Sequence, residues 1–423
     1  MNHRLRLPVS FPVQPIRLPF LLFSLLLILG ACAPHPISPR QEPSGVDAPS
    51  PPAGSVETDE VTDHSYEGAR RIILVIGDGM GAAQLTAASL YHTGREDGLA
   101  LQSLPVRGEV ATGSASHEIT DSAAAGTALA TAVKVENGVV GVRLPGDGTA
   151  LPSITGDLKE LGWGIGLVTT AFTTHATPAA FGANVASRLD YPGIAEDYLS
   201  GLRPEVILGG GGFGMEPAAA AEAGYTVVQD ADALARESRR LAPGGKIVGL
   251  FGNGNLPYLY DGRPSHTPGL VEMAEAAVDV LARNEEGFFL MIEGARIDHA
   301  GHANDIRRLI PELLELDAVV QMLLEHPQLQ EQTLLVVTAD HETGGLAVTR
   351  SAGQGVMPEV TWSTTGHTAA KVPLFAGGPG AAALAEVVDN TLLRGALSAS
   401  LEPPGGGELM AETVVSTPGS PGE

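Results

Sequence analysis

Cysteine, basic side chains and long apolar runs are all scarce in this chain of 423 residues. Cys32 is the single cysteine, so the chain can form no internal disulfide. Only 25 lysines and arginines stand against 49 acidic residues, a formal net charge of −24. Such a chain lacks the basic surface with which a general nucleic-acid binder contacts phosphates. If it handles phosphate, its positive charge must be local, in metal ions or a placed arginine.

The apolar run at 18–29 is too short for a comfortable membrane span, and it follows three arginines, as in an export signal. It ends in small residues directly before Cys32, which is similar to the signal of bacterial lipoproteins. We therefore expect 1–32 to be a lipoprotein-type signal peptide. The protein would be exported to the cell envelope or periplasm, lipid-anchored at Cys32 or secreted. An ordinary secretory signal is the alternative.

Composition divides the rest of the chain into three parts. Residues 33–65 are rich in proline, serine, glycine and acidic residues and are expected to form a disordered linker. Residues 401–423 have the same composition and are expected to form a disordered tail. A folded catalytic domain is predicted over 66–400, because 43% of the chain is hydrophobic, ample for a core.

Apolar runs without polar alternation predict five buried strands, at 71–76, 165–170, 206–208, 288–292 and 333–338. Helical patterns lie between them, most clearly at 268–284 and 305–325. Buried strands separated by helices predict an α/β fold with a large, mainly parallel central sheet and helices on both faces. The segment 190–265 is richer in glycine, proline and tyrosine and is interpreted as holding an insertion beside the sheet.

Polar residues follow these strands, where open α/β sheets collect their chemistry. Aspartate and histidine together suit zinc, whereas sites with only oxygen donors suit magnesium. A mixed set therefore indicates more than one metal ion. Taken singly, each residue has an ordinary alternative, such as a turn, a helix cap or a loop histidine. The candidate ligands are Asp78, Thr177, Glu293, Asp298, His302, Asp340, His341 and His367.

Ser122 stands at the start of an alanine-rich stretch that runs to Val133 and favours helix. Thr120 or Asp121 can cap this helix, which places Ser122 in its first turn. Free backbone N–H groups and the helix dipole favour an anion there, so the hydroxyl is a candidate nucleophile. Without an activator, Ser122 would be an ordinary residue at a helix start.

Seven short motifs follow one another between about residues 70 and 380: IGDGMG at 76–81, TDSAA at 120–124, ATPAA at 176–180, SR at 187–188, EGARID at 293–298, TADHETGG at 338–345 and TGHT at 365–368. With these motifs the chain resembles the alkaline phosphatases that use two zinc ions and one magnesium ion. The resemblance implies an alkaline-phosphatase-like three-layer sandwich. It also implies hydrolysis of phosphate monoesters through a phosphoserine intermediate at Ser122.

The resemblance further implies a role for each matching residue. The first zinc would be held by Asp298, His302 and His367, and the second by Asp78, Asp340, His341 and Ser122. Magnesium would be held by Asp78, Thr177 and Glu293. The second zinc would lower the pKa of the serine hydroxyl, as a bound metal does for water. Arg188 would bind two phosphate oxygens through its planar fork.

His175 and His299 stand at positions that vary within the family, where some bacterial enzymes have aspartate and lysine. We expect both to lie beside the ligands or to contact substrate, rather than to bind metal. Each is alternatively a histidine that lines the site without a catalytic duty. The ion in the third site depends on this choice for His175.

The resemblance favours a phosphomonoesterase that acts on small phosphate monoesters, and it implies a homodimer. A phosphodiesterase or sulfatase-like hydrolase on the same fold is the alternative, because such relatives often use another nucleophile and need not keep the family arginine. A non-catalytic envelope lipoprotein is a third hypothesis. The presence of both Ser122 and Arg188 favours the first.

Overall fold

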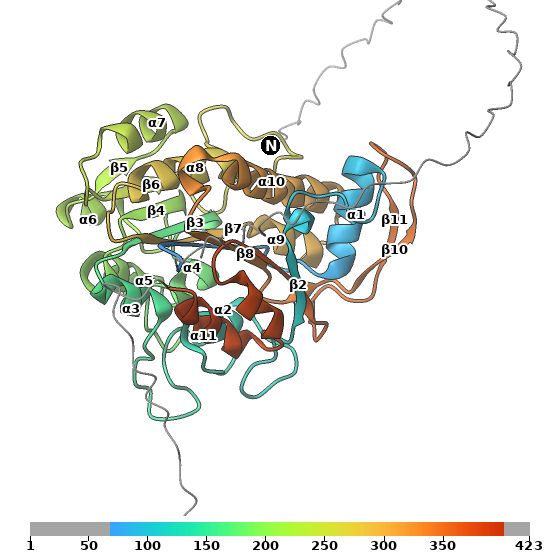
Figure 1. Ribbon diagram of the computed structural model, residues 1–423, viewed down its shortest axis with the longest axis horizontal. Helices are drawn as coiled ribbons and strands as arrows, with labels where there is room; N and C mark the ends of the chain where they lie inside the picture. The colour runs from blue at the N-terminus through green and yellow to red at the C-terminus, as the bar shows by residue number, and fades with distance from the viewer. Residues whose placement is uncertain (1–67, 402–423) are drawn as a thin grey trace, which may run out of the picture. The chain divides into compact units, whose positions relative to one another are not determined.

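The computed structural model describes residues 68–401, shown in colour in Figure 1. The expected signal segment 1–32 with Cys32, the linker 33–65 and the tail beyond residue 401 lie outside the described residues. Within 68–401, no helix combines the length and the apolar character needed to cross a membrane.

A nine-stranded sheet forms the centre of the described domain, in the order β2-β13-β8-β1-β7-β3-β4-β6-β5. All strands run parallel except β13, which is antiparallel to both of its neighbours. The predicted α/β fold with a mainly parallel sheet is confirmed. The strands are β1 (Arg71–Ile76), β2 (Val106–Val110), β3 (Gly164–Phe172), β4 (Val206–Gly210), β5 (Thr226–Val228), β6 (Ile247–Leu250), β7 (Phe288–Glu293), β8 (Thr333–Thr338) and β13 (Val372–Gly377).

Helices cover both faces of this sheet (Figure 1). One face carries α1 (Ala82–Thr93), α7 (Ala231–Arg240), α8 (Leu270–Leu281) and α10 (Ile306–Glu325). The other face carries α2 (Ser122–Thr131), α3 (Ile154–Glu160), α4 (Ala176–Ala180), α5 (Tyr191–Glu196) and α11 (Leu393–Ala399). The helix α9 (Arg296–His302) directly follows β7, and α6 (Pro217–Glu222) precedes β5 at the sheet edge. Both sheet faces are therefore covered, which is why the strands show no polar alternation.

The register of the central strands brings their carboxyl ends together. Ile76 of β1 pairs with Glu293 of β7 on one side and with Thr338 of β8 on the other. Glu293 in turn pairs with Thr169 of β3. Four strands from three distant parts of the chain thus end at one edge, and the residues that follow them become neighbours.

The interpretation of 190–265 as an insertion beside the sheet is wrong. This segment supplies β4, β6 and β5, which are consecutive strands at one edge of the central sheet itself. Strands β5 and β6 are only three and four residues long. Such short strands within glycine-rich sequence show too few residues for a periodic pattern, so the sequence did not reveal them.

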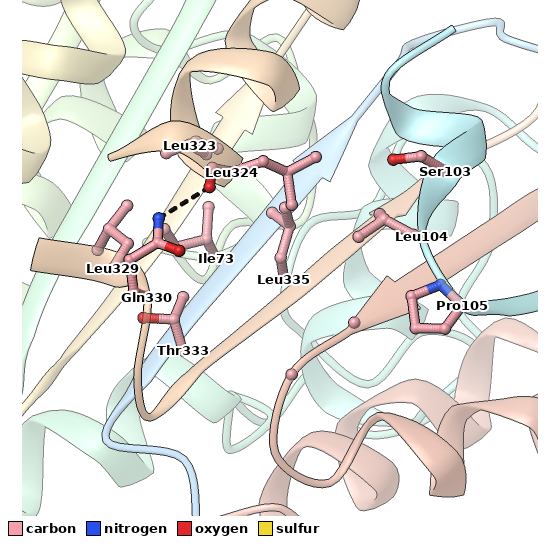
Figure 2. A pocket seen from close by; sticks show the side chains of 12 residues that line it. Ile73, Ser103, Leu104, Pro105, Leu323, Leu324, Leu329, Gln330, Thr333 and Leu335 are labelled. Atoms are coloured by element: carbon pink, nitrogen blue, oxygen red, sulfur yellow. Dashed lines mark hydrogen bonds between the residues drawn. The ribbon is translucent and has the colours of Figure 1, made fainter. Parts of the chain in front are cut away.

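An apolar pocket of about 250 Å³ lies at the opposite edge of the sheet from these carboxyl ends (Figure 2). Ile73, Leu335 and Leu323 are among the residues that line it. Gln330 and Leu324 also line it, and the side-chain amide of Gln330 donates a hydrogen bond to the carbonyl of Leu324 at 2.8 Å. No charged side chain lines this pocket, so it offers neither metal ligands nor a cation for a phosphate group.

Candidate active site

Ser122 is the first residue of α2, as predicted from its sequence. Asp121 caps the helix, because its carboxylate accepts a hydrogen bond from the backbone N–H of Ala124 at 3.0 Å. The Ser122 side chain is buried, and its hydroxyl lies 3.3 Å from Nε2 of His341. The serine therefore meets one of the predicted ligands, although the two are 219 positions apart in the chain.

The three residues predicted for the first zinc come together from α9 and from the strand β12 (His367–Thr368). Nε2 of His302 lies 3.3 Å from an Asp298 oxygen and 3.1 Å from Nε2 of His367. Nδ1 of His302 faces the carbonyl of Thr365 at 2.6 Å, and Nδ1 of His367 faces that of Thr120 at 2.8 Å. Carbonyls only accept, so both Nδ1 atoms carry protons and both Nε2 atoms are left for a shared cation.

The residues predicted for the second zinc follow β1 and β8 and are fully buried. Nε2 of His341 lies 3.3 Å from an Asp340 oxygen and 3.7 Å from an Asp78 oxygen. Neither oxygen of Asp78 has a hydrogen-bond partner, and nor does Oδ2 of Asp340. Buried carboxylate oxygens without partners are costly unless a cation fills the space between them. This observation fits a metal ion at the site.

His341 also lies beside the first group. Its ring stacks on that of His367 with centroids 3.5 Å apart, and ligand atoms of Asp298, His341 and His367 all lie within 4.8 Å of one another. A second set within the same distance is Asp78, Asp340 and His341. The two groups are thus contiguous, and His341 borders both.

A third group surrounds Glu293 at the end of β7. Ligand atoms of Asp78, His175 and Glu293 lie within 4.8 Å of one another. The hydroxyl of Thr177 and Oε1 of Glu293 are buried without hydrogen-bond partners. His175 was expected beside this site rather than among its ligands, and here it lies close enough to be one. These three groups are candidate sites for divalent metal ions.

The electrostatics of the groups also favour cations. Burial raises the pKa of Asp78 well above its usual value, and the nearby Asp340, Asp298 and Glu293 raise it further. Burial likewise raises the pKa of Glu293 to about 7. The hydrogen bond to Asp298 raises the pKa of His302 to about 9. In the metal-free protein, protons must therefore supply the positive charge that this acidic cluster requires.

Arg188 contacts both the residue before Ser122 and His175 of the third group. Its guanidinium donates to Asp121 at 2.9 Å, and its other terminal nitrogen lies 3.4 Å from Nε2 of His175. Asp121 therefore caps the serine helix and orients the arginine at the same time. The pKa of Asp121 is lowered, because hydrogen bonds from Ala124 and the charge of Arg188 outweigh its burial.

His299 projects from α9 beside Asp298. Nδ1 of His299 accepts a hydrogen bond from Arg296 at 3.1 Å, which leaves the proton of the neutral ring on Nε2. Burial lowers the pKa of His299 to about 4. The Arg296 guanidinium stacks on the Tyr258 ring at 3.7 Å from its centroid, so the loop after β6 fixes this arginine.

Sequence reasoning missed three residues that organise the site. Asp121 was predicted only as a helix cap, Arg296 only as part of a motif, and Thr343 was given no role. The Thr343 hydroxyl donates to Asp298 at 2.5 Å and lies 3.3 Å from Nδ1 of His341, so it joins two metal groups. Their roles depend on contacts that only the fold creates, and none of the three stands in a pattern that would mark it in the sequence.

The family model for alkaline phosphatase matches residues 69–358. The chain belongs to the alkaline phosphatase family. His367 lies beyond the matched residues, and the structure places it beside Asp298 and His302, as the TGHT motif predicted.

Several curated phosphatases are similar to about two thirds or more of this chain. The alkaline phosphatase of Escherichia coli (strain K12) is 32% identical, over 79% of this chain and 86% of its own length. The streptomycin-6-phosphate phosphatase of Streptomyces griseus is also 32% identical, over 79% and 90%. Alkaline phosphatase 4 of Bacillus subtilis (strain 168) is 35% identical over 66% of this chain, and the match spans 62% of its length.

Solved alkaline phosphatases share the fold. The enzyme of Thermus thermophilus has a TM-score of 0.70 and 28% identity, over 79% of this chain and 92% of that one. The cold-active enzyme of a psychrophilic Shewanella sp. has a TM-score of 0.69 and 28% identity, over 78% and 99%. The α/β sheet and the family resemblance therefore agree.

One prediction concerns the effect of pH on the stability of the fold around α10. Glu312 of α10 is buried and accepts from the backbone N–H of Leu259, and burial raises its pKa from 4.5 to about 7. Its stabilising contribution is complete below about pH 4.5 and is lost as the pH rises through 7. Glutamine carries no charge at any pH. We therefore expect the change that Glu312→Gln makes in the free energy of unfolding to be more favourable at pH 9 than at pH 5, by about 1–3 kcal/mol.

Denaturant unfolding at the two pH values measures this difference. The exposed Glu275→Gln on α8 serves as a control that removes the same charge from the surface. An equal effect of Glu312→Gln at both pH values would show that the buried carboxyl does not titrate as described.

Proposed function

We propose that this protein hydrolyses phosphate monoesters through a phosphoserine formed on Ser122, with two zinc ions and one magnesium ion. The position of the buried Ser122 hydroxyl carries the proposal. It lies 3.3 Å from His341 of the metal groups, and the residue before it holds Arg188 at 2.9 Å. A nucleophile, a cation site and an anion-binding arginine thus meet at one helix end.

The donor sets support the choice of metals. Asp298, His302 and His367 would hold one zinc, and Asp78, Asp340 and His341 the other, since zinc accepts mixed nitrogen and oxygen donors. Asp78, Thr177 and Glu293 would hold magnesium through oxygens, with His175 beside them. A histidine-to-aspartate variant of the alkaline phosphatase from the Antarctic bacterium TAB5 holds magnesium in its M3 site. When bound, the zinc ions would lower the pKa of hydroxyl groups and neutralise developing negative charge.

The reaction is a double displacement at phosphorus. The Ser122 oxygen forms a bond to phosphorus as the ester oxygen leaves with its electron pair and takes up a proton as the alcohol. Water then breaks the phosphoserine, which gives inorganic phosphate and restores the serine hydroxyl. The free N–H groups at the start of α2 and the Arg188 guanidinium stabilise the non-bridging oxygens throughout.

The presence of Arg188 favours monoesters over the alternative substrates, which are diesters and sulfates. Arginine binds two charged oxygens at once through its planar fork, and a monoester presents them whereas a diester carries a single charge. Asp121 holds the guanidinium in place for this contact.

Turnover of an aryl phosphate and of its methyl diester tests the choice. We expect the wild-type enzyme to prefer the monoester. We further expect Arg188→Ala to lower kcat/KM for the monoester by about 30- to 1,000-fold, the loss of a desolvated charge pair, and to affect the diester less. A clear preference of the wild type for the diester would overturn the monoesterase assignment.

Export and partners complete the proposal. We propose that 1–32 directs export and that Cys32 carries a lipid that anchors the enzyme in the cell envelope; mass analysis of the mature protein would reveal an unmodified or absent Cys32 if this is wrong. We also propose that the enzyme acts as a homodimer, which its mass in solution would test.

A further inference from the structure

Three aromatic side chains gather beside the arginine that we assign to phosphate. We call Phe172, Tyr191 and Phe213 the aromatic shelf. The Phe172 and Phe213 rings are stacked with centroids 4.2 Å apart, and Tyr191 meets the edge of each at 5.3 Å. They come from the end of β3, the start of α5 and the loop after β4, all at the carboxyl edge of the sheet.

Phe213 is held outward in a conformation that a bulky residue rarely adopts. The residue is 46% exposed, and its backbone is left-handed, with φ of 48°. The Thr174 hydroxyl fixes this turn by donating to the Phe213 carbonyl at 2.6 Å. A strained backbone that exposes an aromatic ring at the rim of a site indicates a function for the ring.

The shelf is continuous with the phosphate-binding side of the site. Phe172 packs edge-on against His175, with centroids 5.2 Å apart, and Nε2 of His175 lies 3.4 Å from Arg188. Phe213 stands one ring beyond Phe172. Two ring contacts therefore separate Phe213 from the side chain beside Arg188, which is the arrangement expected for a substrate whose aromatic group is joined to phosphate through a sugar.

We propose that the aromatic shelf binds the planar base of a nucleoside 5′-monophosphate while its phosphate lies at Arg188. This inference rests on the proposed function and names a substrate class for it. Stacking on an aromatic ring accepts any base, because every base presents a π face. The shelf would therefore favour nucleotides over phosphorylated sugars without reading base identity.

Hydrolysis of adenosine 5′-monophosphate and ribose 5-phosphate tests the proposal, because both carry a phosphorylated ribose and only the first carries a base at C1′, where the second has a hydroxyl group. We expect wild-type kcat/KM to be about 5- to 100-fold higher for the nucleotide. Phe213→Asn removes the ring, and asparagine tolerates the left-handed backbone. In this variant, the values of kcat/KM for the two substrates should differ by no more than about twofold, because KM for the nucleotide rises. The kcat/KM for ribose 5-phosphate should be nearly unchanged.

Two further variants make the result specific. Phe213→Tyr keeps an aromatic ring and should keep the preference. Leu161→Asn alters a similarly exposed apolar residue between α3 and β3, away from the shelf, and should behave as wild type. Equal kcat/KM for the two substrates in the wild type, or an equal loss for both in Phe213→Asn, would overturn the shelf alone. A wild-type enzyme that hydrolyses neither would overturn the proposed function itself.

Discussion

Replacing Ser122 with alanine is expected to lower kcat for phosphate monoesters by at least about 10³-fold. The hydroxyl is buried at the start of α2, 3.3 Å from Nε2 of His341, and the residue before it holds Arg188. Alanine favours helix and keeps the Asp121 cap, so the variant should fold. The loss would therefore report the missing nucleophile and not a damaged site.

A covalent phosphoenzyme gives the second readout. Wild-type protein incubated with phosphate monoester and quenched in acid should carry one phosphate on Ser122, which peptide mass analysis locates. Ser122→Ala should carry none, and the exposed Ser351→Ala should behave as wild type. Hydrolysis by Ser122→Ala at the wild-type rate would show that the serine mechanism is wrong.

Chelation of divalent metals is expected to abolish activity and also to destabilise the fold. Asp78, Asp340 and Glu293 are fully buried, and Asp78 has no hydrogen-bond partner for either oxygen. Without a cation these carboxylates repel one another or must take up protons. A free ion concentration of 100 times Kd would stabilise the fold by about 2.7 kcal/mol. For a domain of this size, that is a rise of about 4 °C in Tm.

Metal add-back separates the sites. Zinc with magnesium should restore both activity and Tm in the chelated protein, and each ion alone should restore less. In Asp78→Asn, which removes a charge shared by two of the candidate groups, add-back should raise Tm less than in the wild type. Restoration of activity by calcium alone, or a chelated enzyme that remains active, would contradict the metal assignment.

The sequence predicted those elements whose pattern is long enough to read. The strands at 71–76, 288–292 and 333–338 were recognised because their apolar runs are continuous, and the helix at 305–325 because it spans several turns. Strands β5 and β6 escaped because three or four residues carry no period. Strand β2 escaped because its burial alternates at the sheet edge. Strand β13 escaped because it contains Pro373, and proline argues against an interior strand.

Sequence alone determined the chemistry available to this protein: a serine at a helix start, aspartates and histidines after buried strands, and one arginine in a family motif. Only the tertiary structure decided which of them meet. The order β8-β1-β7-β3 sets Asp340, Asp78, Glu293 and His175 side by side, and no local pattern encodes that order. The Asp121 contact with Arg188 and the aromatic shelf likewise join distant segments, because crossover helices return each strand to the same edge of one sheet.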